Sequence, residues 1–136
     1  MSHLASAALQ TAIHARLTGD PVLAATVTGV FDRIPEPASF PFILLGVAGV
    51  SDWSTKTFHG QRHTVTLQVF ARDSGELALR QLADLVSASM LSAPLEADGQ
   101  ETVGPFFDSL QTLADADGVR QARLRFIVFT QAGAGQ

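Results

Sequence analysis

Two histidines, His59 and His63, are the residues best suited to bind a metal or to act as a base. A spacing of four suits a metal when both side chains lie on one face of a helix. Here they flank Gly60 at the start of an extended stretch, and Asp52 is the only nearby candidate for a third ligand. This arrangement favours a structural or surface role for both histidines over a metal site.

The run Asp115-Ala-Asp117-Gly118 begins like a calcium-binding loop. Such a loop needs glycine at its sixth position and glutamate at its twelfth, where this chain has Arg120 and Phe126. A tight turn between two strands is therefore the favoured interpretation. No Gly-Lys-Ser/Thr follows the glycines of the chain, so the sequence lacks a phosphate-binding loop as well.

A hydrolase triad can be drawn from Ser51 or Ser54 with His59 or His63. The Gly-x-Ser-x-Gly turn that exposes a nucleophilic serine is absent, however, and short polar residues are common in any loop. The sequence therefore predicts no catalytic residue, no metal ligand and no cofactor site. We expect a protein that is not an enzyme.

Binding residues are easier to find than catalytic ones. Aromatic side chains in irregular or edge-like segments serve either the core or a protein interface, where tryptophan and phenylalanine are enriched. The candidates of this kind are Trp53, Phe58, Phe106 and Phe107. Arg123 and Arg125 share one face of the last predicted strand, where they either protect a sheet edge or form an ion pair, within the chain or with another subunit. We carry all six residues forward as candidates for an oligomer or partner interface.

The composition also points to protein partners. Of 136 residues only 16% are charged and 46% are hydrophobic, whereas a soluble domain typically carries about 25% charged residues. The formal net charge of −4 disfavours non-specific binding to nucleic acid. No apolar run reaches the ~20 residues that span a membrane, and the absence of cysteine excludes disulfides. We therefore expect uncharged surface that contacts other subunits, and no membrane association.

The first half of the chain predicts a helix over residues 4–17, a helical turn or two over 21–26, and a short extended piece over 30–34. An apolar strand follows over 42–47. Residues 49–62 are polar and form either a loop or an extended hairpin arm.

The second half begins with an alternating strand over residues 64–72. A helix follows, with Asp73 as its cap and Glu76 completing a capping box, and ends before Pro94. Residues 102–113 form an edge strand with a bulge at Gly104-Pro105, and a two-residue turn at Asp117-Gly118 leads to a strand over 121–130. The pattern predicts a single α+β domain over residues 1–131, a small, mainly antiparallel sheet with helices packed on one face. We expect residues 132–136 to be a disordered tail.

Several of these segments, in this order and spacing, resemble a known family. They are Leu17-Thr18-Gly19-Asp20-Pro21, Val30-Phe31-Asp32-Arg33-Ile34-Pro35, Phe40-Pro41-Phe42-Ile43-Leu44-Leu45-Gly46, Asp52-Trp53-Ser54-Thr55, His63-Thr64-Val65-Thr66-Leu67-Gln68-Val69-Phe70 and Leu124-Arg125-Phe126. The chain is similar over nearly its whole length to the DUF3168 group of tail completion, or tail terminator, proteins. These occur in tailed phages, prophages and phage-like gene transfer agents.

The resemblance implies a structural protein made in the bacterial cytoplasm and located at the head-proximal end of the tail. Such a protein caps the tail tube as a ring, usually a hexamer, and joins it to the head-to-tail connector, while DNA passes through the lumen without specific binding. The alternatives are a head-to-tail stopper, a minor tail protein or a small cytosolic binding module. A hydrolase is the least favoured. The family offers no catalytic residue to carry over.

Overall fold

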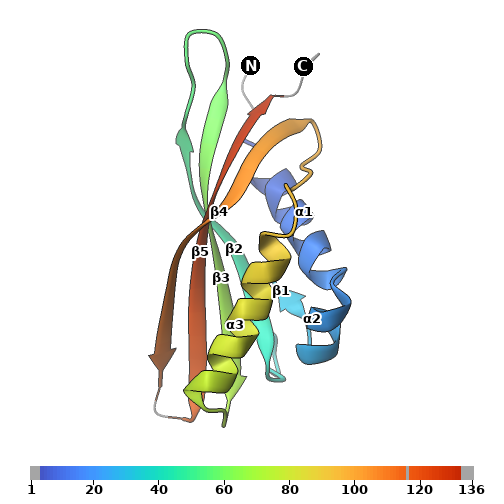
Figure 1. Ribbon diagram of the computed structural model, residues 1–136, viewed down its shortest axis with the longest axis vertical. Coiled ribbons are helices and arrows are strands. Elements are labelled where there is room, and N and C mark those ends of the chain that lie inside the picture. Colours follow the sequence, from blue (N-terminus) through green and yellow to red (C-terminus); the bar gives the residue numbers. More distant parts are fainter. Residues whose placement is uncertain (1–3, 116, 133–136) are drawn as a thin grey trace.

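The computed structural model, which describes residues 4–115 and 117–132, is one twisted sheet with helices on a single face (Figure 1). The elements in chain order are α1 (Ser6–Thr18), α2 (Pro21–Thr26), β1 (Val30–Phe31), β2 (Phe42–Asp52), β3 (Gly60–Arg72), α3 (Glu76–Met90), β4 (Gln100–Ala114) and β5 (Val119–Ala132). No helix among these residues is long and apolar enough to cross a membrane.

The described residues form a five-stranded sheet in the order β1-β2-β3-β5-β4. Only β1 runs parallel to its neighbour, at Val30↔Ile43 and Phe31↔Leu44. The three other pairings are antiparallel, so β2 and β5 run one way while β3 and β4 run the other. The predicted α+β class, with helices on one face of a mainly antiparallel sheet, is confirmed.

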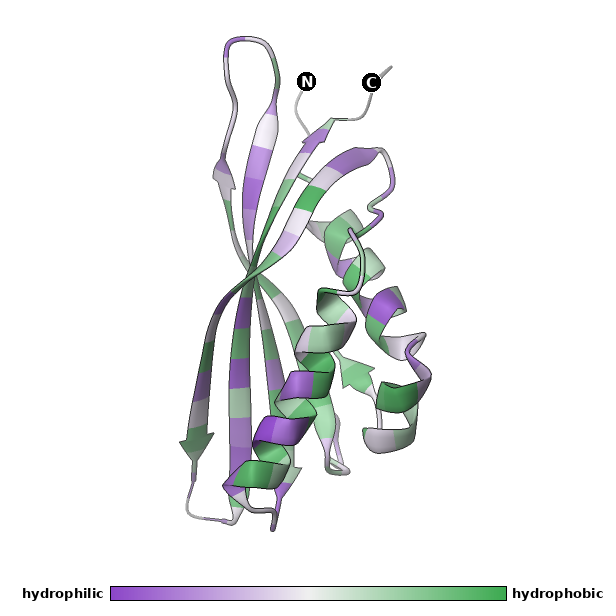
Figure 2. Ribbon diagram, in the orientation of Figure 1, coloured by the Kyte–Doolittle hydropathy of each residue, from purple (hydrophilic) through white to green (hydrophobic). Residues whose placement is uncertain are grey.

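Strict alternation of side chains explains the two central strands. From His63 to Ala71 in β3 and from Ala122 to Thr130 in β5, every second residue is buried against the helices, and the intervening residues are mostly polar or partly exposed. Figure 2 shows this alternation as changing colour along β5. The fully buried side chains on the helix side include Leu67, Val69, Leu124, Phe126 and Val128. We call this the helix side of the sheet and the opposite surface the helix-free face.

The helices complete the core with one side each. Leu9, Ile13 and Leu17 recur along α1 and are all buried, as the sequence predicts. α2 begins with Pro21, and the Asp20 carboxylate caps it by accepting hydrogen bonds from the amides of Val22 and Leu23.

Arg16 joins the end of α3 to α1. Its guanidinium donates hydrogen bonds to the carbonyl oxygens of Ser89, Met90, Ala93 and Pro94, at 2.9–3.3 Å. The last carbonyls of a helix have no partners within the helix, and a cation there also opposes the negative end of its dipole. One side chain thus connects two helices that are far apart in the chain.

Residues 49–62 form an arm and not a loop. β2 continues to Asp52 and β3 begins at Gly60, so the two strands stay paired as a hairpin along the sheet, with a bulge between Val47 and Gly49. The hairpin interpretation of this segment is confirmed. Close to the base of the arm, the backbone amide of Ala5 donates to the side-chain oxygen of Gln61 at 2.9 Å.

Three local predictions are wrong. Asp73 does not cap α3, because Asp73 adopts a left-handed conformation with φ of 55° and its amide bonds to Gly118; the N-cap is Gly75. The turn between β4 and β5 is longer than two residues, because β4 ends at Ala114 and β5 begins at Val119. Ala132 belongs to β5, while the rest of the predicted tail, 133–136, lies outside the described residues.

Candidate interaction surface

The tip of the arm is held by short-range hydrogen bonds. The amide of Trp53 donates to the carbonyl of Gly60 at 2.8 Å, and the amide of Thr55 donates to that of Phe58 at 3.0 Å. The hydroxyl of Ser54 accepts from the amide of Gly60 at 3.0 Å and donates to the Asp52 carboxylate at 2.7 Å. The two strands therefore stay paired up to the tip, which positions the aromatic side chains of the arm.

Gly60 makes room for those aromatic rings. A Cβ atom at this position would lie 2.8 Å from Phe58 Cε2 and 2.9 Å from Trp53 Cε3, closer than real Cβ atoms approach. The absence of a side chain lets both rings fold back over the strand. A glycine in the interior of a strand often marks such a close approach.

Trp53 and Phe58 join a wider group of rings on the helix-free face. The ring centroids of Trp53 lie 5.5 Å from Phe58 and 4.5 Å from Phe129, and Phe106 lies 6.2 Å from Phe129. Val103 is opposite Phe129 in the β4–β5 register. We call this group the aromatic patch: Trp53, Phe58, Val103, Phe106 and Phe129.

The patch is accessible as well as apolar. Trp53 is 41% exposed, Phe106 50% and Val103 51%. Exposed apolar patches of this kind are typical of interaction sites. Phe129 was not a candidate in the sequence because it lies in a regular strand. Phe129 is separated from Arg123 and Arg125 by an even number of residues, so the alternation of side chains along a strand places it on their face. The sequence offered this signal.

Phe107 is separated from the other candidates. The sheet register pairs it with the core residue Phe126, and the two rings meet at 5.9 Å in a T shape. Phe107 therefore points to the helix side, opposite to its neighbour Phe106. It is nevertheless 49% exposed, and so is an exposed apolar side chain outside the aromatic patch.

Arg123 and Arg125 lie on the helix-free face, away from the aromatic patch. Their strand, β5, lies between β3 and β4, so the interpretation that they protect a sheet edge is wrong. Within the described residues the one ion pair joins Arg80 to Glu76, so neither arginine pairs with a carboxylate there. Both line a shallow hollow of about 390 Å³ that reaches Gly46 and Ala48 on β2.

The two histidines are not brought together around a ligand. His63 is fully buried on the helix side, with its Nε2 2.8 Å from the hydroxyl of Thr130, whereas His59 is exposed in the arm. Burial lowers the pKa of His63 below its ordinary value of 6.5, because the charged ring would lose its hydration. No group of three or more metal-binding side chains occurs in residues 4–115 and 117–132.

The hydrolase triad considered from the sequence, Ser51 or Ser54 with His59 or His63, is not assembled either. Ser54 uses its hydroxyl within the arm, bonded to Asp52 and to the backbone of Gly60. His63 is buried on the opposite side of the sheet from the arginine-bearing face. The arrangement as a whole offers surfaces for binding.

A family model described as tail completion protein gp17 matches residues 11–131. The chain belongs to this family. Tail completion is therefore its role, and it is a structural component of the tail of a phage or phage-like particle. The resemblance inferred from the sequence is confirmed.

Solved structures agree with this family assignment. This tail completion protein is similar to a chain from the virion of a native gene transfer agent particle, with 29% identity and a TM-score of 0.85, over 96% of this chain and 100% of that one. It shares its fold with bacteriophage SPP1 gp17, at 20% identity and a TM-score of 0.64, over 98% and 95% of the two chains. No curated protein matches.

Proposed function

We propose that this tail completion protein acts as a tail terminator, which caps the head-proximal end of the tail tube as a homo-oligomeric ring and joins the tube to the head-to-tail connector. The resemblance to tail terminators favours a hexamer. The proposed mechanism is binding without catalysis: occupation of the tube's end stops further polymerisation and offers a new surface to the connector.

The observation that supports this proposal best is the aromatic patch at the arm end of the sheet. It lies on the helix-free face, partly exposed, and is fixed in place by the close fit of Trp53 and Phe58 over Gly60. Buried tryptophan side chains are frequent hot spots of protein interfaces, where truncation costs about 2 kcal/mol or more. We assign the patch to the contact with the tube or with the connector.

The charge distribution suits a ring that DNA passes through. The formal net charge of −4 makes tight non-specific binding of DNA unfavourable. Arg123 and Arg125 have no carboxylate partner among the described residues of their own chain. In the ring we assign them to pairing with carboxylates of a neighbouring subunit.

Co-sedimentation with purified tail tubes that lack their terminator tests the proposal. The wild-type chain should sediment with the tubes and appear as a density at one tube end in electron micrographs. Trp53→Ala should reduce binding at least tenfold, while Leu77→Ala on α3, where Leu77 is 71% exposed, should bind normally. Binding to connector subunits alone, with none to tubes, would assign the stopper role instead.

A further inference from the structure

The edge of β2 is open along most of its length. β1 pairs with β2 only at Ile43 and Leu44. β3 occupies the other side of β2, and within the described residues no strand pairs with β2 on the β1 side from residue 45 to residue 52. Strand edges of this kind present unpaired backbone amides and carbonyls to other chains. We call residues 45–52 the free β2 edge.

Proteins usually protect such edges with charges or prolines, and most of this edge has neither. Residues 45–51 read Leu-Gly-Val-Ala-Gly-Val-Ser, with a single bulge as interruption. Gly46 and Gly49 have open space where a side chain would lie. This stretch therefore has the composition of a strand that accepts a further strand.

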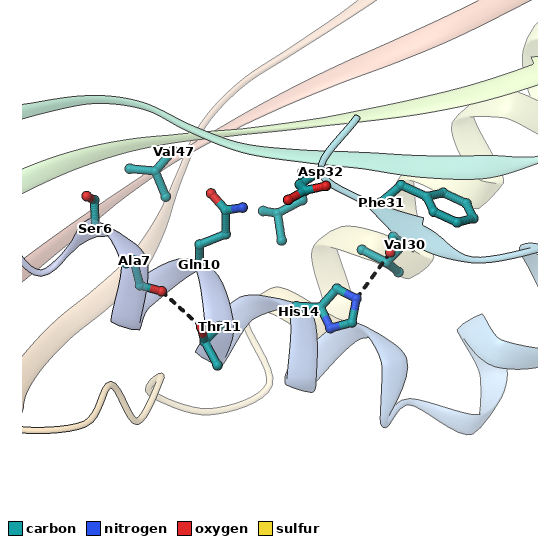
Figure 3. Close-up of a pocket in the computed structure, with 10 residues that line it drawn as sticks. Ser6, Ala7, Gln10, Thr11, His14, Val30, Phe31, Asp32 and Val47 are labelled. Carbon is teal, nitrogen blue, oxygen red and sulfur yellow. Dashed lines mark hydrogen bonds between the residues drawn. The ribbon is translucent and has the colours of Figure 1, made fainter. Parts of the chain in front are cut away.

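There is room for an added strand on both sides of the sheet. On the helix side, a cleft of about 670 Å³ lies between α1 and the strands β1 and β2. Figure 3 shows Gln10 of α1 facing Val47 and Asp32 across this cleft, while His14 Nε2 lies 3.1 Å from the carbonyl oxygen of Val30. On the helix-free face lies the hollow of about 390 Å³ lined by Arg123 and Arg125. The side chains of an added strand, which point alternately to the two faces of the sheet, would thus have space on both faces.

The opposite edge of the sheet, β4, has the matching properties. Two bulges and Pro105 interrupt its first part, but residues 109–114 are regular and contain no charge and no proline. Figure 1 shows α3 lying along the centre of the sheet and α1 near β1 and β2. β4 has less cover: Leu110 packs against the core and the hydroxyl of Thr112 donates to Glu76 of α3 at 3.0 Å, but Phe107 on the same side is 49% exposed.

We infer that β4 of one copy of this chain pairs with the free β2 edge of the next copy, so that the sheet continues from subunit to subunit around the ring. The helix side of β4 at residues 110–114 would then face the cleft beneath α1 of the neighbour. The inference rests on the proposed ring. We call this contact between β4 and the neighbour's free β2 edge the seam.

Strand direction and charge both suit a second copy as the occupant. β4 runs antiparallel to β2 within one chain. Rotation about the ring axis keeps the strand directions, so β4 meets the neighbour's β2 as an antiparallel pair, which can form regular hydrogen bonds. In the sheet register Gln111 is level with Leu44, so pairing residues 109–114 with residues 45–52 requires strands that are inclined to the ring axis, as they are in closed β-barrels. Such an interface is heterologous and closes into a ring. β4 also carries the exposed carboxylate of Asp108, which forms no ion pair within the described residues and is opposite in charge to Arg123 and Arg125, which line the hollow beside the free β2 edge.

Cysteine cross-linking tests the seam cleanly, because the chain has no cysteine of its own. A variant with both Ala48→Cys and Gln111→Cys places one thiol at each edge. The two positions are separated by β3 and β5, a distance of roughly 14 Å, and a disulfide spans at most about 7 Å between Cα atoms. Oxidation can therefore link only different copies. We expect a ladder of covalent oligomers that ends in a closed ring.

The controls separate this inference from the proposed function. Each single variant should yield dimers at most, and Ala48→Cys with Leu77→Cys on α3 should yield no ladder. Ser109→Cys replaces Gln111→Cys in a second double variant with Ala48→Cys. If light scattering detects oligomers but neither double variant forms a ladder, the seam is wrong and the ring still stands. A ladder from a chain that captures no tubes would keep the seam and refute the terminator proposal. A chain that stays monomeric and unlinked at the highest soluble concentration would also overturn the seam.

A second variant tests the seam without thiols. Ala48→Lys adds a charge to the exposed bulge of the free β2 edge and should weaken self-association at least tenfold while leaving thermal stability unchanged. Thr57→Lys, at the exposed arm tip, is the matched control and should associate normally. Equal association of both variants would contradict the seam.

Discussion

The ring centroids of Trp53 and Phe129 lie 4.5 Å apart, although Trp53 belongs to the arm and Phe129 to β5. β3 runs between β2 and β5 in the sheet, so the indole reaches across a whole strand. It can do so because it passes over Gly60, the first residue of β3. The position of the aromatic patch thus depends on one residue without a side chain.

Gly60→Ala should displace this indole. The new methyl group would overlap Trp53 and Phe58, and we expect a loss of about 1–3 kcal/mol in the free energy of unfolding, as for other overpacked sites. Trp53 is the sole tryptophan, so its fluorescence reports the change directly as a red shift and stronger quenching by iodide. Gly49→Ala, with open space around its Cβ, should leave the spectrum unchanged. Identical spectra for the two variants would refute this account of the arm.

Arg16→Ala should be among the most destabilising substitutions of a partly exposed residue. It removes hydrogen bonds from one cation to the carbonyls of Ser89, Met90, Ala93 and Pro94, and we expect a loss of about 2–3 kcal/mol in urea denaturation. Arg80→Ala is the control, since Arg80 only contacts Glu76 at 3.9 Å on the surface. That loss should stay below about 0.5 kcal/mol. Similar losses for both would show that the Arg16 contacts contribute little.

The stability of the chain should fall on mild acidification because of His63. Burial lowers the pKa of His63 in the folded state, so the unfolded chain takes up a proton below its ordinary value of 6.5 while the folded chain resists it. The free energy of unfolding therefore decreases as the pH falls below that value, by at most about 1.4 kcal/mol per pH unit for one proton.

Denaturation between pH 7.5 and pH 5 in His63→Gln isolates this effect. The variant should lose the part of the slope that this histidine causes, whatever its absolute stability. His59→Gln, in the exposed arm, should keep the wild-type slope. An unaltered slope in His63→Gln would mean that another group controls the response to acid.

Arg123 and Arg125 should matter for assembly and not for folding. Both are at least partly exposed and lack a carboxylate partner in the described part of their own chain, so Arg123→Ser with Arg125→Ser should change the free energy of unfolding by less than about 0.5 kcal/mol. Self-association measured by light scattering should weaken at least tenfold and lose part of its salt dependence. Arg72→Ser, an exposed arginine at the end of β3, is a suitable control. Unchanged association would remove both arginines from the interface.

Local patterns in the sequence predicted most of the fold. The alternation in β3 and β5, the apolar spacing of α1, and the bulge at Gly104-Pro105 each depend on residues close in the chain, and each is found. The cap of α3 was predicted wrongly because the conformation of Asp73 depends on a residue distant in the sequence: its amide donates to the carbonyl of Gly118, just before the neighbouring strand β5. No neighbouring residue reveals such a contact.

The interaction surface was predictable only in part, for the same reason. The alternation of side chains along a strand places Phe106 and Phe107 on opposite faces of the sheet, whereas the sequence analysis had grouped them as one kind of interface candidate. The convergence of Trp53, Phe58 and Phe106 on Phe129 follows from strand order, which the sequence pattern does not contain. Similarly, Arg123 and Arg125 were consistent with an edge until the order β3-β5-β4 placed their strand inside the sheet.

The hydrogen bond from the Ala5 amide to Gln61 has a practical meaning for the particle as a whole. Gln61 is opposite Thr130 near the end of β5, so both described ends of the chain meet at the base of the arm. A compact label fused to either terminus would therefore mark the same pole of every subunit. Seen in micrographs of assembled tails, such a label would show directly whether the arm points toward the capsid or toward the tail tip.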